Sequence, residues 1–109
     1  MAQTAKRLIS GSQLTGSAAT YYTAPANTTT IIKKLVLVNT TAGAVACTIY
    51  LIPSGGSAGA TNTLTISRSI GINESWSCPE AENMVLAPGG FIQALGLSVT
   101  ILSSGIEIT

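Results

Sequence analysis

The residues that could carry out chemistry are few in this chain of 109 residues. It contains no histidine and no aspartate, and its candidate catalytic groups are four glutamates and two cysteines. Without histidine, the chain lacks the most common general base and the most common metal ligand in proteins. A serine or cysteine nucleophile would have no base beside it. The composition therefore predicts that the protein is not an enzyme and has no bound cofactor.

Glu80 and Glu82 are the two carboxylates closest to each other in the sequence. Such a pair could act as acid and base if both side chains faced one cleft. It could also bind Ca²⁺ weakly together with backbone carbonyls, although calcium loops usually contain more carboxylates. We therefore expect a solvated acidic loop or one helical turn here, and no metal site.

Cys47 and Cys78 lie 31 residues apart, without a CxxC spacing. Together with the lack of histidine, this spacing argues against a zinc or redox site. Cys47 falls inside an apolar run, where a cysteine acts as a small core residue. Cys78 precedes Pro79 among polar neighbours, so we expect it to be more exposed. Two reduced thiols are the favoured interpretation, and a disulfide is the alternative.

Charged residues make up only 8% of the chain, whereas about 25% is typical of a soluble domain. Hydrophobic residues make up 46%, and the net charge is +1. The surface must therefore consist largely of Thr, Ser, Ala, Gly, Asn and some apolar groups. Such a surface suits a subunit that packs against copies of itself or against a larger assembly. A neutral, threonine-rich monomer is the alternative.

The basic residues include two adjacent pairs, Lys6-Arg7 and Lys33-Lys34. Binding to nucleic acid requires many cations that face the phosphates, so two short pairs predict no nucleic-acid partner. Lys33 and Lys34 follow each other in a predicted strand, which would place them on opposite faces rather than in one patch.

The chain is expected to form one domain. Residues 1–17 would be an N-terminal arm or an edge strand, and residues 18–109 the β-sandwich domain. Gly11 and Gly16 separate the first apolar run from the rest, so residues 6–14 could reach a neighbouring subunit. The apolar runs are shorter than the ~20 residues of a membrane span, and the first residues do not resemble a signal peptide.

Strand signals dominate the sequence. Thr, Ile, Val and Ser are abundant, turn residues recur at short intervals, and long helical periodicity is missing. The pattern predicts an all-β, antiparallel β-sandwich of jelly-roll or immunoglobulin-like topology, with seven to nine strands and no substantial helix. Candidate strands lie at residues 6–10, 19–23, 28–39, 44–52, 64–70, 74–78, 91–95, 97–102 and 105–108.

Two turns are expected between these strands. The segments 28–39 and 44–52 are predicted to pair as a hairpin around the turn at 39–43, because the second segment alternates apolar and other residues. After Lys34 the first segment is apolar on both faces, which indicates that a neighbour covers it. The residues APGG at 87–90 predict a type II turn.

The aromatic residues are few, and three of them suggest contact surfaces. Tyr21 and Tyr22 could form a carbohydrate-stacking platform or an interface anchor, although one tyrosine in the core and one at the surface is the favoured interpretation. Trp76 is more consistent with a core or interface plug than with a ligand platform. The candidate interface residues are Lys6, Arg7, Leu8, Tyr21, Tyr22 and Trp76.

Four stretches of the chain resemble small virion proteins of tailed bacteriophages. They read YYTAPANTTTIIKKLVLVNT at 21–40, IYLIPSGGS at 49–57, LAPGGFIQA at 86–94 and SGIEIT at 104–109. The resemblance is one of style and arrangement, and such proteins have no defining motif residues. It therefore implies a fold and a location, and no functional residue is carried over from it.

The resemblance implies a β-sandwich located in the virion and made in the host bacterial cytoplasm. Its most direct implication is a capsid decoration (cement) protein that stabilises the particle through lateral contacts. The implied partners are copies of itself, in many such proteins as a trimer, and the major capsid protein or tail and neck proteins. A tail, collar or fibre component remains an alternative. A second alternative is a carbohydrate-binding adhesin that uses Tyr21, Tyr22 or the loop at 53–62.

Overall fold

The structure, a computed structural model, describes residues 3–109 apart from the side chains of Ala60, Ile66 and Glu80. The described residues form nine β-strands and two single 3-10 turns, η1 and η2. These elements confirm the predicted all-β class and the expected number of strands. In chain order they are β1 Gln3–Gln13, β2 Ala19–Thr23, β3 Thr29–Val38, β4 Val45–Ile52, η1 Ala60–Asn62, β5 Thr63–Ile70, β6 Ser75–Ser77, η2 Pro79–Ala81, β7 Met84–Leu86, β8 Phe91–Leu95 and β9 Thr100–Ile108.

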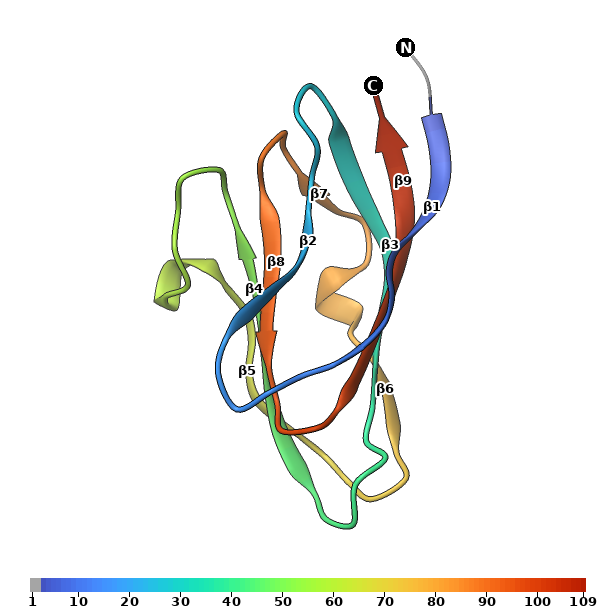
Figure 1. Cartoon of the computed structure of the whole chain (residues 1–109), viewed down its shortest axis with the longest axis vertical. Helices are drawn as coiled ribbons and strands as arrows, with labels where there is room; N and C mark the ends of the chain where they lie inside the picture. Colours follow the sequence, from blue (N-terminus) through green and yellow to red (C-terminus); the bar gives the residue numbers. More distant parts are fainter. Residues whose placement is uncertain (1–2) are drawn as a thin grey trace.

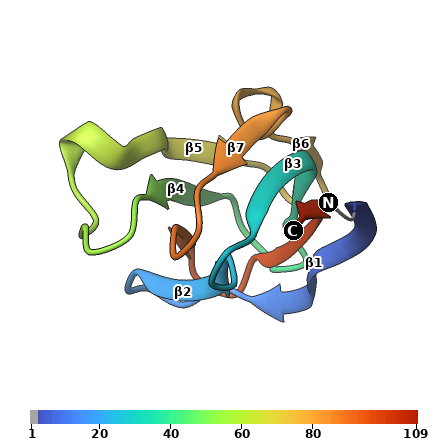
Figure 2. The same ribbon diagram turned by 90° about the horizontal axis from the view of Figure 1, so that it is seen from above.

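The strands form two antiparallel sheets that face each other as a sandwich (Figures 1 and 2). Sheet A has the strand order β1-β9-β3-β6, with β7 also paired to β3, and sheet B has the order β2-β8-β4-β5. Each sheet therefore interleaves strands from the two halves of the chain. Two sheets with this eight-position order, connected by crossings between them, make a jelly roll. The strand order thus selects the jelly roll over the immunoglobulin-like alternative.

β6, η2 and β7 together fill one position beside β3. β6 pairs with residues 36–38 of β3, and β7 pairs with residues 30–32. Between them, the Cys78 N–H donates to the Leu35 carbonyl at 2.8 Å and the Asn83 N–H donates to the Ile32 carbonyl at 2.6 Å. These bonds keep the edge of β3 paired while Pro79, which has no N–H, starts the η2 turn. The segment therefore acts as one interrupted strand.

The core lies between the sheets, where alternate residues of each strand point inward. On β9 this alternation buries Ile101, Ser103 and Gly105, and on β8 it buries Ile92 and Ala94. One continuous cluster of buried side chains joins both sheets. Because so many of these side chains are large and aliphatic, hydrophobic burial is the main stabilising contribution.

β1 is an edge strand of sheet A. It pairs with β9 from Gln3 to Gln13, and Leu8, Ile9 and Leu14 lie in the core. This strand covers residues 3–13, while residues 1–2 lie outside the described part. The segment that could have served as an arm therefore forms part of the sandwich in this structure.

The predicted hairpin of residues 28–52 is wrong. β3 lies in sheet A and β4 in sheet B, so the chain crosses between the sheets at Asn39. The Asn39 side chain is fully buried, and its Nδ2 donates to the carbonyls of Gly43 and Ile70, both at 2.8 Å. Its Oδ1 accepts from the Thr41 N–H at 2.9 Å. Alternation identifies a strand but does not say which strand is its neighbour, and here a buried amide directs the crossing.

The predicted type II turn at residues 87–90 is confirmed. The Gly90 N–H donates to the Ala87 carbonyl at 2.9 Å, and Gly89 has φ +82°, which the third position of this turn requires. Nearby, the loop after β4 folds back on Ile52, since a Cβ on Gly56 would lie 3.1 Å from the Ile52 Cγ2. Ile52 is fully buried although it does not belong to the main core cluster.

Two bulges lie opposite the same level of β9. On β3, Ile32 pairs with Gly105 and Lys34 with Ser104, so Lys33 is an extra residue. On β1, Arg7 pairs with Ser104 and Ile9 with Ser103, so Leu8 is an extra residue. A bulge changes which residues face inward. The buried positions of β3 accordingly change from residues 30 and 32 to residues 35 and 37.

Candidate interaction surface

No catalytic constellation is present among the side chains that the structure describes. No group of three or more His, Cys, Asp or Glu residues in this part of the chain could hold a metal ion. The Glu74 carboxylate accepts the Gly71 N–H of its own turn at 2.6 Å, and Glu82 is exposed. The proposed pairing of Glu80 with Glu82 involves a side chain outside those described.

Cys47 and Cys78 are both fully buried and do not form a disulfide with each other. Cys47 fills the core position expected from its apolar run, and burial raises the pKa of its thiol. The expectation that Cys78 is more exposed is wrong, because Cys78 lies beside β3, bonded to the Leu35 carbonyl, and its side chain belongs to the core cluster. Local polarity in the sequence did not indicate this long-range packing.

A polar cluster at one end of the sandwich connects the two sheets. The Tyr22 hydroxyl lies 2.8 Å from the Thr30 Oγ1 and donates to the Glu107 carboxylate at 2.5 Å. Lys6 forms an ion pair with the same carboxylate, with 3.5 Å between Nζ and Oε2. Burial, followed by the bond to Glu107, raises the pKa of Tyr22 to about 12. Glu107, which no sequence motif marks, thus anchors a tyrosine 85 residues away.

The structure disperses the six predicted interface residues. Leu8 and Tyr22 lie in the core, with 8% and 9% of their surface exposed, and Tyr21 is half-buried against it. Trp76 lies half-buried on β6, at the edge of sheet A opposite to β1. The Arg68 guanidinium lies 4.6 Å from the centroid of its ring. This cation–π contact joins β5 of sheet B to β6 of sheet A. Of the six, only Lys6 and Arg7 are exposed, and Lys6 forms an ion pair with Glu107.

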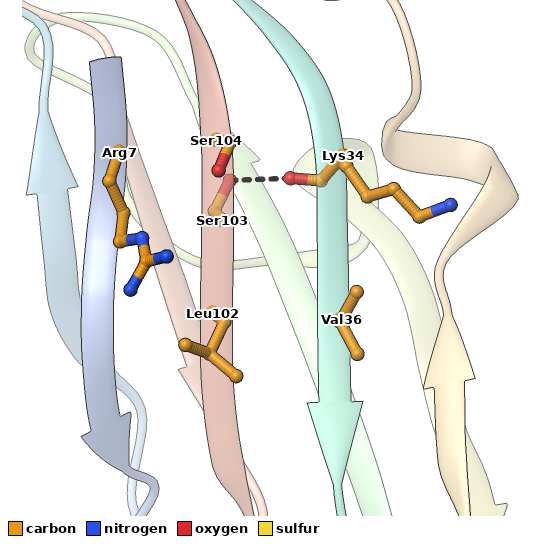
Figure 3. Close-up of a pocket in the computed structure, with 6 residues that line it drawn as sticks. All are labelled: Arg7, Lys34, Val36, Leu102, Ser103 and Ser104. Atoms are coloured by element: carbon orange, nitrogen blue, oxygen red, sulfur yellow. Dashed lines mark hydrogen bonds between the residues drawn. The ribbon is translucent and has the colours of Figure 1, made fainter.

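Arg7 instead belongs to a row of side chains that crosses the outer face of sheet A. Arg7 pairs with Ser104 of β9, and Ser104 pairs with Lys34 of β3. Figure 3 shows Arg7 and Lys34 on the strands that flank β9, with Ser104 between them. The Ser103 hydroxyl, from the inner side, donates to the Lys34 carbonyl at 2.9 Å and so satisfies a backbone group at the bulge.

The prediction that Lys33 and Lys34 point to opposite faces is wrong. Both side chains are exposed, because the bulge at Lys33 interrupts the alternation of β3. The Lys33 Nζ donates to the neutral Asn83 Oδ1 at 3.1 Å. Two shallow hollows of about 260 and 540 Å³ adjoin at Ser104, and these cations line them. We call this surface the cationic face. It is formed by Arg7, Lys33, Lys34 and Ser104, together with the aliphatic side chains described next.

Aliphatic side chains surround the cations on the same face. On β9, Leu102 and Ile106 alternate with the buried residues, and on β3 Val36 pairs with Leu102 and Ile31 with Ile106. These four side chains are half-buried. Val85 of β7, opposite Ile31, is 58% exposed. The apolar character that the sequence indicated for both faces of β3 is therefore present, without a covering element among the described residues.

Among the described residues, no helix is both long and apolar enough to cross a membrane. No protein-family model and no curated protein matches this chain.

Structural similarity is found to chains of infectious bursal disease virus. A chain in the crystal structure of the T13 viral particle has a TM-score of 0.52 and 12% sequence identity, over 97% of this chain and 30% of that chain. Chains from the Gx and Gt strains have TM-scores of 0.49 and 0.47 at 16% and 13% identity, with the same two coverages. The chain thus spans less than a third of the length of these viral chains. At these identities the likeness to the T13 particle chain concerns the fold alone, so one part of a viral particle protein has the same fold as this chain.

Proposed function

We propose that the protein is a non-enzymatic structural protein of a virus particle and acts as a capsid decoration protein of a tailed phage. The observation that carries this proposal is the cationic face, a sheet surface rich in aliphatic side chains with no covering element in the described chain. An exposed apolar surface of this kind marks a site of assembly. The jelly-roll fold shared with a viral particle chain supports a place in a particle, and the sequence resemblance supports a phage origin.

The proposed location is the virion, after synthesis in the host cytoplasm. The proposed partners are further copies of the chain, for which a trimer is one arrangement, and the major capsid protein. The low charge of the chain supports this choice, because a protein that remains covered in an assembly does not need a highly charged surface for solubility. Lateral contacts would stabilise the particle by binding only its assembled form.

The first experiment determines whether the protein occurs in particles and in how many copies. Mass spectrometry of purified virions, with labelled peptides as standards, should find the protein at hundreds of copies if it decorates the capsid lattice. A few to dozens of copies would instead place it in the tail, collar or fibre. Its absence from purified virions would contradict the proposal.

The second experiment measures stabilisation directly. Capsids that lack the protein should melt at a lower temperature than decorated capsids, and added purified protein should restore the higher value. A glycan array is the matched test of the adhesin alternative. Tyr22, one of the two tyrosines suggested for stacking on a sugar, is buried and bonded to Glu107, so we expect no glycan binding.

A further inference from the structure

We propose that the cationic face binds an acidic surface of another particle protein, rather than a second copy of this chain or a nucleic acid. This inference rests on the proposed function and deepens it, because it names the surface and the chemistry of the partner. Its observations are the three cations brought together by two bulges, the aliphatic side chains around them, and the engagement of the chain's own carboxylates elsewhere.

The two bulges create the cationic face. Leu8 on β1 and Lys33 on β3 are extra residues that interrupt the alternation of these strands. The insertions lie on both sides of Ser104 and leave Arg7, Lys33 and Lys34 exposed around it. Bulges are common where a strand must reorient side chains for a contact. Of the five basic residues in the chain, three are thus collected on one face.

The charge of this face is not neutralised within the described chain. The one ion pair among the described side chains joins Lys6 to Glu107 and leaves Arg7, Lys33 and Lys34 without a carboxylate partner. Lys33 bonds to an uncharged amide. The proposed partner surface would supply carboxylates, since opposite charges across an interface fix register and exclude wrong partners.

A second copy of the chain fits this requirement poorly. Two cationic faces packed about a twofold axis would place like charges against each other, which costs on the order of several kcal/mol. The chain also offers few carboxylates for a head-to-tail contact, because Glu74 and Glu107 are bonded within their own fold. Among the described glutamate side chains, only Glu82 is exposed without an internal bond. A separate acidic protein is the better match.

Nucleic acid fits poorly for a different reason. Phosphate binding gains affinity from many cations along the backbone, and here three cations lie among aliphatic side chains. Leu102 and Val36 line the same hollow as Arg7 and Lys34 (Figure 3). A protein surface can cover both kinds of group, since typical interfaces combine an apolar centre with complementary charges. Beside a phosphate backbone, the aliphatic side chains would stay exposed to water.

The test compares two variants with the same change in net charge. Arg7→Gln/Lys34→Gln removes two cations from the cationic face, and Thr23→Glu/Ser69→Glu adds two anions at exposed positions of sheet B. The full-length proteins are added to genome-free particles from a virus that lacks this gene, and binding is measured by co-sedimentation. Thermal melting verifies that both variants are folded.

We expect the first variant to bind at least tenfold more weakly, which corresponds to about 1.4 kcal/mol, and to show a weaker dependence on salt. The control should stay within about twofold of wild type, because diffuse charge acts weakly at physiological ionic strength. A photo-crosslinker at Ser104 should attach to a particle protein through an acidic segment, and one at Gln93 on sheet B should not.

The outcomes separate the two proposals. If wild-type protein binds particles and both variants bind equally well, the cationic face is not the contact and the inference is overturned while the decoration function stands. A crosslink from Ser104 to another copy of the chain overturns the inference, as does binding only to genome-filled particles with a crosslink to nucleic acid. If wild-type protein does not bind at all, the proposed function fails and this inference fails with it.

Discussion

The outer faces of the two sheets differ in whether their polar and charged side chains have partners among the described residues. Across sheet B, one row runs through Thr20, Gln93, Tyr50 and Thr63, all uncharged. Within it, the Gln93 Nε2 donates to the Thr20 Oγ1 at 3.0 Å. Across sheet A, the corresponding row contains Arg7, Ser104 and Lys34. The charges of Arg7 and Lys34 have no partner among the described side chains.

The comparison indicates that the few charged residues of this chain are unevenly distributed between the two sheets. Sheet B uses hydrogen bonds within its own row, and its loop after β4 covers Ile52. Sheet A concentrates cations and aliphatic side chains on a face that the described residues leave uncovered. On the proposal above, a partner would cover the outer face of sheet A, whereas no partner is proposed for that of sheet B. The predictions below test this difference, beginning with the largest effect on stability.

Gly105 lies in sheet A beside Ser104, and its replacement should separate the strands that form the cationic face. A Cβ at this position would overlap the backbone oxygen of Ile31 and lie 2.9 Å from the Leu8 Cδ1. Gly105→Val should therefore lower the free energy of unfolding by about 3 kcal/mol or more, as overpacking against rigid backbone does. Urea denaturation measures the change.

Gly43→Ala is the matched control, because a Cβ there would meet nothing within 4 Å. It should change the free energy of unfolding by less than about 0.5 kcal/mol. Equal effects of the two substitutions would show that the strands of sheet A do not approach each other as closely as described. In that case the row of Arg7, Ser104 and Lys34 would lose its structural basis.

Asn39 directs the crossing between the sheets, so its loss should weaken both of them. Asn39→Ala removes the side-chain donor to the buried Ile70 carbonyl and the acceptor of the Thr41 N–H, while the Gly43 carbonyl keeps its bond from the Thr41 hydroxyl. Unsatisfied buried polar groups make the expected cost about 2–3 kcal/mol. Thermal unfolding measures it, and Thr40→Ala, at the exposed neighbouring position, serves as control. A loss below about 0.5 kcal/mol would contradict the role of Asn39.

Tyr22 links sheet B to sheet A through Glu107, and this link should be lost in alkali. Its pKa is raised in the fold to about 12, whereas the unfolded chain titrates near 10.0. The neutral phenol therefore contributes stability that is fully present below pH 10 and is lost as the pH rises towards 12. Tyr22→Phe should cost about 1 kcal/mol at pH 7.

The difference in stability between wild type and Tyr22→Phe should shrink between pH 10 and 12, which pH-dependent urea denaturation would reveal. Tyr50→Phe, on the outer face of sheet B, controls for removal of a phenol and should cost less at pH 7. A difference between wild type and Tyr22→Phe that stays constant up to pH 12 would show that the bond to Glu107 does not stabilise the neutral phenol.

The sequence predicted the parts of this fold that depend on neighbouring residues. Alternation marked most of the strands, and the glycine and proline spacing marked the turn that contains Gly89. It did not predict features that depend on distant residues. β3 and β4 were expected to pair, but the bonds of Asn39 to Gly43 and Ile70 place them in different sheets.

The cationic face illustrates the same limit. The pairs Lys6-Arg7 and Lys33-Lys34 were visible in the sequence, but each was interpreted within its own strand. One extra residue on each strand decides which side chains point outward, and no local pattern marks a bulge in a run of such similar residues. β9, which brings Arg7 and Lys34 together through Ser104, lies about 70 residues from Lys34 along the chain. Predicting this face would have required the strand order.

The smallest expected effect distinguishes the two outer faces most directly. Lys34→Thr removes an exposed cation without a partner among the described side chains and introduces a residue that favours strands, so it should change stability by less than about 0.5 kcal/mol. Gln93→Ala removes the bond to Thr20 from the outer face of sheet B and should cost about 0.5–1 kcal/mol. Both values come from chemical denaturation of the isolated protein. If Lys34→Thr costs more than Gln93→Ala, then Lys34 stabilises the single chain, and its exposure no longer indicates a missing partner. If the order is as expected, the isolated chain does not need Lys34 for its own stability, as the proposed contact of this face requires.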